Sequence, residues 1–419
     1  MNTVWVIAET EADQQTLQGL GVNLVLADKT ADAVKIGSWQ SIQDINYILD
    51  LLKNYSGHLV VDISYLPRAI NHLLSQVDVL VLNIHEAEAI LHYAVNSHEA
   101  MEKAAAELLN LGVKSVLLKG SQMHEPQWIH DYWSNGSLSF WLSQKRYPDA
   151  QYSEAGTVYS SAITAALVLG YPTEDAVVIA KMYVHQAIRL ATTTLYYGGF
   201  PEHQIDLPYL ASKPLFVTPQ AFKRSHYLGL YPVVDSAQWV ETLLKSGVKT
   251  IQLRIKECIP TLEEEIKCSI ALAKQYRATL FINDYWELAL KLGAEAVHLG
   301  QSDLDNADLE AIRQQGLLLG VSTYCYHEVA MAHAICPSYM AIGPIYPTTS
   351  KELVFRPQGI DMLARWIRTL NYPLVAIGGI SIARAPEVVA TGVSGVALIS
   401  AITEADDPQD ATRQLLGLM

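Results

Sequence analysis

Short apolar segments alternate with longer amphipathic stretches through the second half of the chain. Segments such as "LYPVV" (230–234), "TIQLR" (250–254) and "AVHLG" (296–300) are nearly continuously apolar, and stretches of helical spacing separate most of them. Near-continuous apolar strands that alternate with helices are typical of parallel strands buried on both faces. Eight such units over roughly 200 residues predict a closed (β/α)8 barrel. An open doubly wound sheet is the alternative, but no glycine-rich dinucleotide turn follows the first of these strands. The other expected strands are 280–282, 317–321, 339–343, 373–378 and 395–399.

The first half of the chain also alternates, and it predicts an open, mostly parallel α/β sandwich. Two apolar helices, at 157–170 and 173–191, follow its expected strands. Residues 198–226 carry several prolines and no steady period, which is typical of a linker or an extended surface segment. We therefore expect domains at 1–197 and 227–419, joined by 198–226. The strands expected in the first domain are 4–8, 24–27, 33–37, 58–63, 79–84, 115–120 and 138–144.

The composition of the chain limits the classes of binding partner and the cellular compartment that we expect. Only 17% of the residues are charged and the net charge is -14, whereas a nucleic-acid or anionic-membrane partner would favour a basic surface. The 4 cysteines form no CxxC pair, which indicates free thiols in a reducing cytoplasm. The N-terminus resembles no signal peptide, and no apolar run reaches membrane-spanning length. We expect a soluble cytoplasmic protein that binds small molecules, neither nucleic acid nor membrane, with self-association into a homo-oligomer left open.

Polar side chains gather where the expected barrel strands end, which is where barrels of this kind carry their chemistry. Two carboxylates, Asp284 and Asp303, follow neighbouring strands, and with nearby amide oxygens they can hold Mg²⁺. Asp284 alone could be only a helix N-cap, and His298 is expected as a packed or hydrogen-bonded core residue. Three cations could bind a diphosphate, and the glycines and serine after the last two strands could bind a second phosphate. These polar positions are Gln252, Arg254, Lys256, Asn283, Gln301, Ser322, Thr348, Thr349, Ser350, Lys351, Gly378, Gly379 and Ser400.

Over about 228–404 the chain resembles the thiamine-phosphate synthase family. The segments that carry the resemblance are "LYPVVD", "QLRIK", "FINDYWELA", "VHLGQSDL", "LGVST", "GPIYPTTSK", "PQG" and "AIGGI". The resemblance implies a transferase that joins hydroxymethylpyrimidine diphosphate to hydroxyethylthiazole phosphate, releases diphosphate and requires Mg²⁺. It implies that Asp284 and Asp303 hold the metal and that Arg254, Lys256 and Lys351 are catalytic. It assigns the pyrimidine diphosphate to Gln252, Arg254, Lys256, Asn283, Ser322 and Lys351, the thiazole phosphate to Thr348, Ser350, Gly379, Ile399 and Ser400, and further substrate contacts to Leu253, Ile255 and Thr349.

Residues 1 to about 195 resemble hydroxymethylpyrimidine-phosphate kinases of the ribokinase-like superfamily, through "DAVKIG", "LNIHEAE", "VLLKG" and the two apolar helices. The resemblance implies a three-layer α/β domain, truncated here because the stretch between the second and third strands is short. The departures fall on the chemistry: Glu154-Ala155-Gly156-Thr157 stands where the family has Gly-Thr-Gly-Cys, and no glycine-rich turn follows the first strand. Asn83, Glu86 and Lys119 of the family pattern remain. Fewer glycine N–H groups and an added carboxylate disfavour a phosphate, so we expect a non-catalytic domain.

Three functions follow from these patterns. The first is the coupling transferase with an inert first domain. The second is a bifunctional kinase and transferase, against which the missing Gly-Thr-Gly-Cys run argues. The third is a non-enzymatic protein that binds thiamine precursors, for which a metal and diphosphate site would have little use.

Overall fold

The computed structural model describes residues 2–7, 9–26, 28, 30–37, 50, 52–53, 55–63, 71–147, 154–225, 227–257, 259–348 and 357–419. Its backbone separates into two units, Met1–Thr218 and Pro219–Met419.

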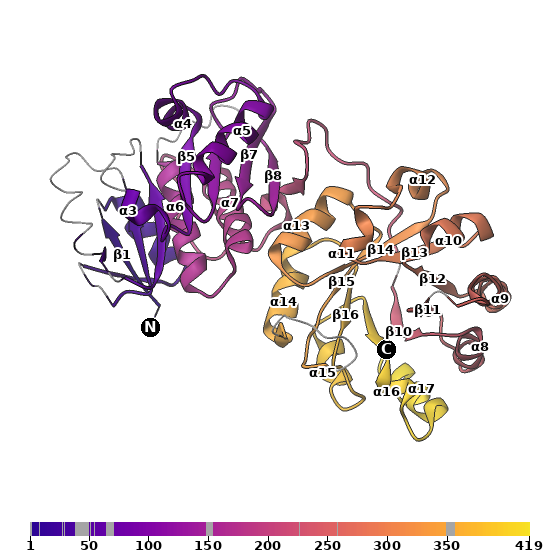
Figure 1. Ribbon diagram of the computed structural model, residues 1–419. Coiled ribbons are helices and arrows are strands. Elements are labelled where there is room, and N and C mark those ends of the chain that lie inside the picture. The colour runs from indigo at the N-terminus through magenta and orange to yellow at the C-terminus, as the bar shows by residue number, and fades with distance from the viewer. Residues whose placement is uncertain are drawn as a thin grey trace. The chain divides into compact units, whose positions relative to one another are not determined.

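A 9-stranded sheet forms the centre of the first unit, in the order β2-β1-β3-β4-β5-β6-β7-β8-β9 (Figure 1). Strands β1 to β6 run parallel, and β7, β8 and β9 are antiparallel to their neighbours. The strands are β1 (Thr3–Ile7), β2 (Asn23–Val25), β3 (Ala33–Ile36), β4 (His58–Asp62), β5 (Val79–Asn83), β6 (Val116–Lys119), β7 (Trp128–Ser134), β8 (Ser139–Lys145) and β9 (Tyr209–Ala211).

Helices cover both faces of this sheet, so the expected three-layer α/β fold is confirmed. Helix α6 packs against α1, α7 and strands β3 and β4, and nearly all of its side chains are buried for that reason. Helices α4 and α5 pack on each other and on β5, β6 and β7. The helices are α1 (Glu11–Gly19), α3 (Asn71–Leu74), α4 (Ile84–Leu91), α5 (His98–Leu109), α6 (Ala155–Val168) and α7 (Thr173–Arg189), with a 3-10 turn, η2 (Gln204–Asp206).

The segment expected as a linker, 198–226, is partly built into the two units. Its residues 209–211 form β9, which extends the sheet beyond β8, and Asp206 beside it pairs with Arg189 at 2.5 Å. Beyond residue 218, Phe222 N–H donates to the carbonyl of Cys336 at 2.9 Å, next to a barrel strand. Short backbone pairings of this kind leave no periodic pattern in the sequence, which is why the segment was interpreted as a connection.

A closed barrel of parallel strands, β10 to β17 in sequence order, forms the second unit (Figure 1), as predicted. Its strands are β10 (Gly229–Val234), β11 (Thr250–Leu253), β12 (Thr279–Asn283), β13 (Ala296–Leu299), β14 (Leu318–Thr323), β15 (Tyr339–Ile342), β16 (Leu374–Ile377) and β17 (Gly395–Leu398). Its helices are α8 (Ala237–Lys245), α9 (Leu262–Tyr276), α10 (Trp286–Leu292), α11 (Gln301–Leu304), α12 (Leu309–Gln314), α13 (Tyr326–Ile335), α14 (Gly359–Thr369), α15 (Ala385–Ala390), α16 (Ser400–Thr403) and α17 (Pro408–Leu416).

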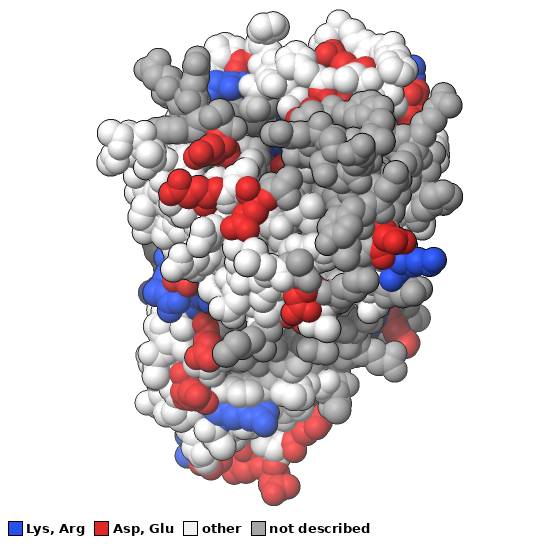
Figure 2. All heavy atoms as spheres, turned by 90° about the vertical axis from the view of Figure 1, so that its left-hand side faces the viewer, with Lys and Arg blue, Asp and Glu red and all other residues white. Residues whose placement is uncertain are grey.

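Among the described residues on the face drawn in Figure 2, acidic and basic side chains are interspersed and no broad basic area forms. Within the same described ranges, no helix combines the length and the apolar character that a membrane crossing needs.

Candidate active site

A cavity of about 510 Å³ lies at the carboxyl end of the barrel, and every strand from β10 to β17 contributes to its lining. The strands converge there because each is parallel to its neighbours and leads into a loop at the same end. Most of the residues predicted from the sequence meet in this one cavity. They are Gln252, Arg254, Asn283, Asp284, Gln301, Asp303, Ser322, Thr348, Gly378, Gly379, Ile399 and Ser400.

Three other predicted residues, Leu253, Ile255 and Lys256, are not among the described residues that line the cavity. Leu253 and Ile255 are buried, 2% and 7% exposed, because alternate side chains of a barrel strand face the helices rather than the interior. Lys256 is exposed beyond the end of β11. Thr349, Ser350 and Lys351 lie outside the described residues, so their predicted roles stay predictions.

Aromatic rings close the floor of the cavity. Phe281 lies between Tyr231 and Tyr339, with ring centroids 5.5 Å and 5.2 Å away, and all three rings are buried. The Tyr339 ring fits only because residue 320 on β14 is glycine: a Cβ there would come within 2.3 Å of the ring. The floor is therefore a packed layer, as is usual for barrel interiors of this size.

A chain of hydrogen bonds crosses this floor. Gln252 Nε2 donates to Tyr231 Oη at 3.2 Å, and the hydroxyls of Tyr231 and Tyr339 lie 2.8 Å apart. His298 joins Tyr339 Oη through Nδ1 at 2.6 Å and Ser322 Oγ through Nε2 at 2.8 Å. Because Tyr231 Oη accepts from Gln252, its own O–H is free to donate to Tyr339 Oη. The O–H of Tyr339 then donates to Nδ1 of His298. Nε2–H of His298 in turn donates to Ser322 Oγ, so the Ser322 hydroxyl can donate its own proton to a group bound in the cavity.

The floor carries no charge at neutral pH. Burial, with a smaller contribution from the positive charge of Arg254, lowers the pKa of His298 to about 3. Burial also raises the pKa of the Tyr231 and Tyr339 hydroxyls above the ordinary value. His298 is thus a hydrogen-bonded core residue, as expected, and its ring also reaches the cavity.

Two carboxyl groups face each other at one side of the cavity. Burial raises the pKa of Asp284 to about 6, and the charge of Asp303 and a hydrogen bond with it act in the same direction. Arg254 and Asn283 lower that pKa by smaller amounts. Asp284 has a left-handed backbone conformation, φ 63°, which Asp tolerates better than most residues. It is not the N-cap of α10, because that position is Tyr285. The alternative that Asp284 serves only as a helix cap is therefore wrong.

The acid pair, Asp284 and Asp303, and its surroundings offer the oxygen ligands that a hard divalent cation needs. Gln301 beside it donates its amide N–H to the Ser322 carbonyl at 2.7 Å. Its amide oxygen is buried and has no hydrogen-bond partner among the described residues. Two carboxylates whose charges repel, with an orphaned amide oxygen nearby, fit a cation bound by oxygen ligands.

The residues predicted to bind a second phosphate lie across the barrel from the acid pair. The acids follow β12 and β13, whereas Gly379, Ile399 and Ser400 follow β16 and β17, which lie on the opposite side of a closed barrel of this order. Gly379 has φ 66°, and a Cβ on it would lie 2.4 Å from the Pro347 carbonyl, so only glycine fits. The two groups of residues predicted to bind anions therefore lie at opposite sides of one cavity.

Sequence reasoning missed the aromatic and hydrogen-bonding residues that shape the cavity. Tyr231 and Tyr339 lie within apolar strands, and their side chains point into the cavity only because the barrel is closed. Tyr324 and Glu328 also line the cavity, and a carboxylate oxygen of Glu328 accepts from the Tyr324 N–H at 3.0 Å. The two-residue alternation of each strand was the available signal for the tyrosines.

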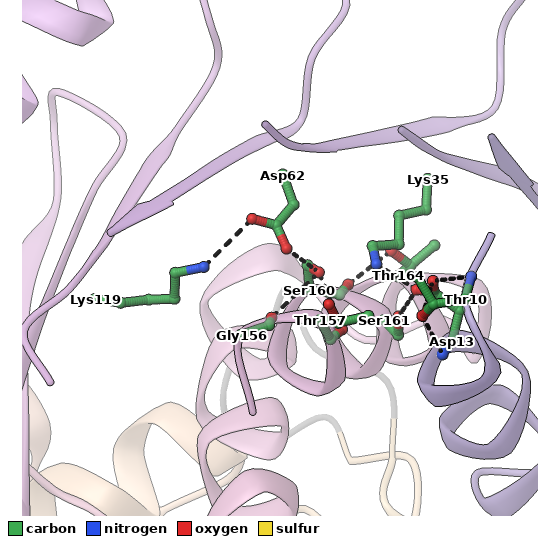
Figure 3. A network of polar contacts seen from close by, with 10 residues as sticks. All are labelled: Thr10, Asp13, Lys35, Asp62, Lys119, Gly156, Thr157, Ser160, Ser161 and Thr164. Atoms are coloured by element: carbon green, nitrogen blue, oxygen red, sulfur yellow. Dashed lines mark hydrogen bonds and ion pairs between the residues drawn. The ribbon is translucent and has the colours of Figure 1, made fainter. Parts of the chain in front are cut away.

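The first unit holds a buried polar network that joins α1 and α6 to strands β3, β4 and β6 (Figure 3). Lys35 pairs with Asp13, and Lys119 pairs with Asp62 at 3.3 Å beside the start of α6. Ser160 on α6 donates to Asp62 at 2.6 Å. Both lysines are thus neutralised by carboxylates of the same unit.

Comparison with known proteins agrees with both units. The family model described as Thiamine monophosphate synthase matches residues 230–402. A thiamine-phosphate synthase of Yersinia pseudotuberculosis is 55% identical over 204 residues, which are 48% of this chain and 95% of that protein.

The chain belongs to the thiamine-phosphate synthase family. It is a transferase, and family membership implies a metal-dependent reaction. A solved thiamine phosphate pyrophosphorylase from Pyrococcus furiosus is 32% identical, with a TM-score of 0.42, and the match covers 46% of this chain and 96% of that one.

The first unit is similar to a different family. The model described as Phosphomethylpyrimidine kinase matches residues 1–201. The pyridoxal kinase from Staphylococcus aureus is 21% identical, with a TM-score of 0.45, and the match covers 50% of this chain and 98% of that one. The chain therefore joins a unit that matches the phosphomethylpyrimidine kinase model to a thiamine-phosphate synthase barrel.

Proposed function

We propose that the barrel joins hydroxymethylpyrimidine diphosphate to hydroxyethylthiazole phosphate with release of diphosphate, and that Asp284 and Asp303 hold the Mg²⁺ this requires. The observation that carries the proposal is the pair of facing carboxyl groups, of which Asp284 has a pKa raised by burial and by the charge of Asp303, in a cavity that Arg254 also lines. Bound there, Mg²⁺ supplies positive charge to the departing diphosphate.

Arg254 and the acid pair define where the diphosphate binds. Arg254 lines the same cavity as the acid pair and His298, and its positive charge lowers the pKa of both Asp284 and His298. A guanidinium in this position forms paired hydrogen bonds with phosphate oxygens and stabilises negative charge as the leaving group departs. Lys256 and Lys351 are proposed to add charge from the rim when the substrate binds.

The floor favours the pyrimidine half of the reaction. When the diphosphate leaves, positive charge develops on the pyrimidine, and an uncharged floor of His298, Tyr231 and Tyr339 adds no repulsion to it. Ser322, which accepts from His298, can donate its proton to a ring nitrogen or an oxygen of the substrate. The same hydrogen bond fixes the orientation of the serine hydroxyl before the substrate arrives.

The thiazole phosphate is proposed to bind at the opposite side of the barrel mouth, at Thr348, Gly379 and Ser400. Its phosphate then anchors the thiazole while the ring nitrogen attacks across the floor, at the carbon that loses diphosphate. The new C–N bond forms as the C–O bond to diphosphate breaks, so no protein nucleophile is required.

Diphosphate release tests this function directly. The full chain, mixed with both substrates and Mg²⁺, should release one diphosphate for each thiamine phosphate formed. Omission of either substrate, or addition of a chelator, should stop the release. Release that is equally fast without the thiazole phosphate would reject the coupling reaction in favour of simple hydrolysis.

We further propose that the first unit does not phosphorylate hydroxymethylpyrimidine phosphate. Lys35 and Lys119 are bound by Asp13 and Asp62, and Glu154, at the start of α6, accepts from the Tyr197 hydroxyl at 2.9 Å. A carboxylate at this helix start repels a phosphate that the helix dipole would otherwise attract.

The bifunctional alternative is favoured by the kinase family model, which matches residues 1–201 of the first unit. An assay of ATP-dependent phosphorylation of the pyrimidine monophosphate by the full chain, without the thiazole substrate, separates the two. We expect no turnover in the wild-type chain. Turnover that disappears in a Lys119→Met variant would establish the kinase activity and overturn this proposal.

A further inference from the structure

Three potential metal ligands converge in the first unit, away from the polar network of α6. Nitrogens of His98 and His130 and an oxygen of Glu125 all lie within 4.8 Å of one another. His98 is the first residue of α5, His130 lies in β7, and Glu125 lies in the loop between β6 and β7. A helix start, a loop and the strand that follows the loop thus bring two imidazoles and one carboxylate close together.

The contacts between these groups are close but poorly directed for hydrogen bonds. Nε2 of His130 lies 2.8 Å from Oε2 of Glu125, and Nε2 of His98 lies 3.1 Å from Oε1. Both nitrogens and Oε2 are nevertheless buried without a hydrogen-bond partner among the described residues. Orphaned buried polar atoms are costly and call for a partner, and a cation between them would satisfy all three at once.

The spacing suits a tetrahedral ion. Ligand atoms about 2.0–2.2 Å from Zn²⁺ lie about 3.3–3.6 Å apart in a tetrahedron, so the measured separations of 2.8 Å and 3.1 Å need to lengthen by less than about 1 Å to admit the ion. Two imidazoles on such an ion have ring centroids about 5 Å apart. The centroids of His98 and His130 are 5.3 Å apart and their planes are inclined by 78°.

Neighbouring residues hold the three groups in place. Nδ1 of His130 lies 2.9 Å from Ser143 Oγ, which also accepts from the Leu215 N–H at 3.0 Å. A partner on the far nitrogen of a ligating histidine fixes the ring orientation and turns the other nitrogen toward the metal. Arg146 donates to the carbonyl of Glu125 at 2.9 Å and to that of Ser121 at 3.0 Å, which orders the loop that carries the carboxylate.

Aromatic rings shield this group of residues on two sides. Phe216 packs on His98 and His130 with centroid distances of 5.5 Å and 4.9 Å, and Trp141 packs on His98 at 5.0 Å. The His130 side chain is 1% exposed, whereas those of His98 and Glu125 are 19% and 21% exposed. The ion would therefore reach its ligands from the side of His98 and Glu125, where water can supply a fourth ligand.

We propose that His98, Glu125 and His130 form a binding site for one divalent transition-metal ion, with Zn²⁺ as the best fit. Two imidazoles and one carboxylate with an open fourth position suit Zn²⁺, whereas Mg²⁺ prefers oxygen ligands. The ion joins α5, the β6–β7 loop and β7. The site is independent of the coupling reaction, because its ligands belong to the first unit and the acid pair belongs to the barrel.

The test is a Zn²⁺ titration of the full chain in excess Mg²⁺, in competition with a chromogenic chelator. The wild-type chain should bind one Zn²⁺ per chain at this site. His98→Gln and Glu125→Gln should each weaken the binding by about 100-fold or more, since even loss of a supporting hydrogen bond costs 10–100-fold. Ser143→Ala, which removes only the support of His130, should weaken it by about 10-fold or more. Bound Co²⁺ should give the visible absorption of a tetrahedral site, which the variants should lose.

The matched control is His85→Gln. His85 pairs with Glu88 at 3.1 Å on the surface, so it offers the same two residue types without a third ligand, and its loss should leave Zn²⁺ affinity unchanged. Hydrogen exchange of the first unit verifies that each variant is folded. Equal Zn²⁺ affinity in the wild type, His98→Gln and Glu125→Gln, or no stoichiometric binding by the wild type, would overturn the proposal.

Discussion

Loss of the Tyr339 hydroxyl tests the hydrogen-bonded floor most sharply. Tyr339→Phe keeps the buried ring and removes the bonds to Tyr231 Oη, 2.8 Å away, and to His298 Nδ1, 2.6 Å away. Each buried group left without a partner costs about 1–3 kcal/mol, and Tyr231 keeps its bond from Gln252. We therefore expect the free energy of unfolding of the barrel to fall by about 2–4 kcal/mol.

The measurement is urea unfolding followed by hydrogen exchange of barrel peptides, which separates this unit from the first. The control is Tyr227→Phe, whose hydroxyl bonds the carbonyl of Met419 at the surface and whose side chain is largely exposed. It should change stability by less than about 0.5 kcal/mol. A Tyr339→Phe barrel as stable as the control would refute the reasoning, because the hydroxyl would then support no buried network.

Three further predictions concern packing and buried charge. Gly320→Ala places a Cβ 2.3 Å from the Tyr339 ring and should destabilise the barrel by about 1–3 kcal/mol in the same assay, whereas Gly417→Ala, whose nearest contact is 3.4 Å, should not. Lys35→Met leaves the buried Asp13 carboxylate without its cation, which should lower the free energy of unfolding of the first unit by about 3–5 kcal/mol. The double variant Asp13→Asn/Lys35→Met should recover most of that loss, and a double variant as unstable as the single one would contradict this. Burial lowers the pKa of His333 to about 4, so the unfolded chain binds a proton below pH about 6.5 while the folded barrel does not. Barrel stability should fall as pH drops from about 6.5 to 4, by up to about 3 kcal/mol from this residue, and His333→Gln should flatten that part of the stability profile measured by urea unfolding.

Much of the barrel could be predicted because its information is local. Each strand is an apolar run between helical stretches, and the count of such runs distinguishes a closed barrel from an open sheet. In the first unit, β7 was missed because His130 and Asp131 interrupt its pattern. Their partners come from other elements: Asp131 accepts from Gly120 and Lys181, and Nδ1 of His130 meets Ser143. Lys181 lies 50 positions from Asp131, so the pattern around β7 does not reveal it.

The acid pair could be predicted for the same local reason, since carboxylates that follow neighbouring parallel strands must meet at one rim. The floor could not be predicted in this way. Tyr231 and Tyr339 are separated by 108 positions, and their hydroxyls meet only across the closed interior. The ligands His98, Glu125 and His130 have unrelated positions on a helix, a loop and a strand, and no spacing rule for metal ligands connects them.

Binding of the metal by Asp284 and Asp303 is the central claim, and Mn²⁺ in place of Mg²⁺ measures it directly by electron paramagnetic resonance. Asp284→Asn and Asp303→Asn keep the shape of each side chain, and Asn also tolerates the backbone of residue 284. Each should weaken Mn²⁺ binding in the presence of diphosphate, and lower Mg²⁺-dependent turnover, by about 100-fold or more. Asp305→Asn, at an exposed position two residues beyond Asp303, should leave both unchanged. Wild-type Mn²⁺ affinity in the Asp284→Asn and Asp303→Asn chains would contradict the account.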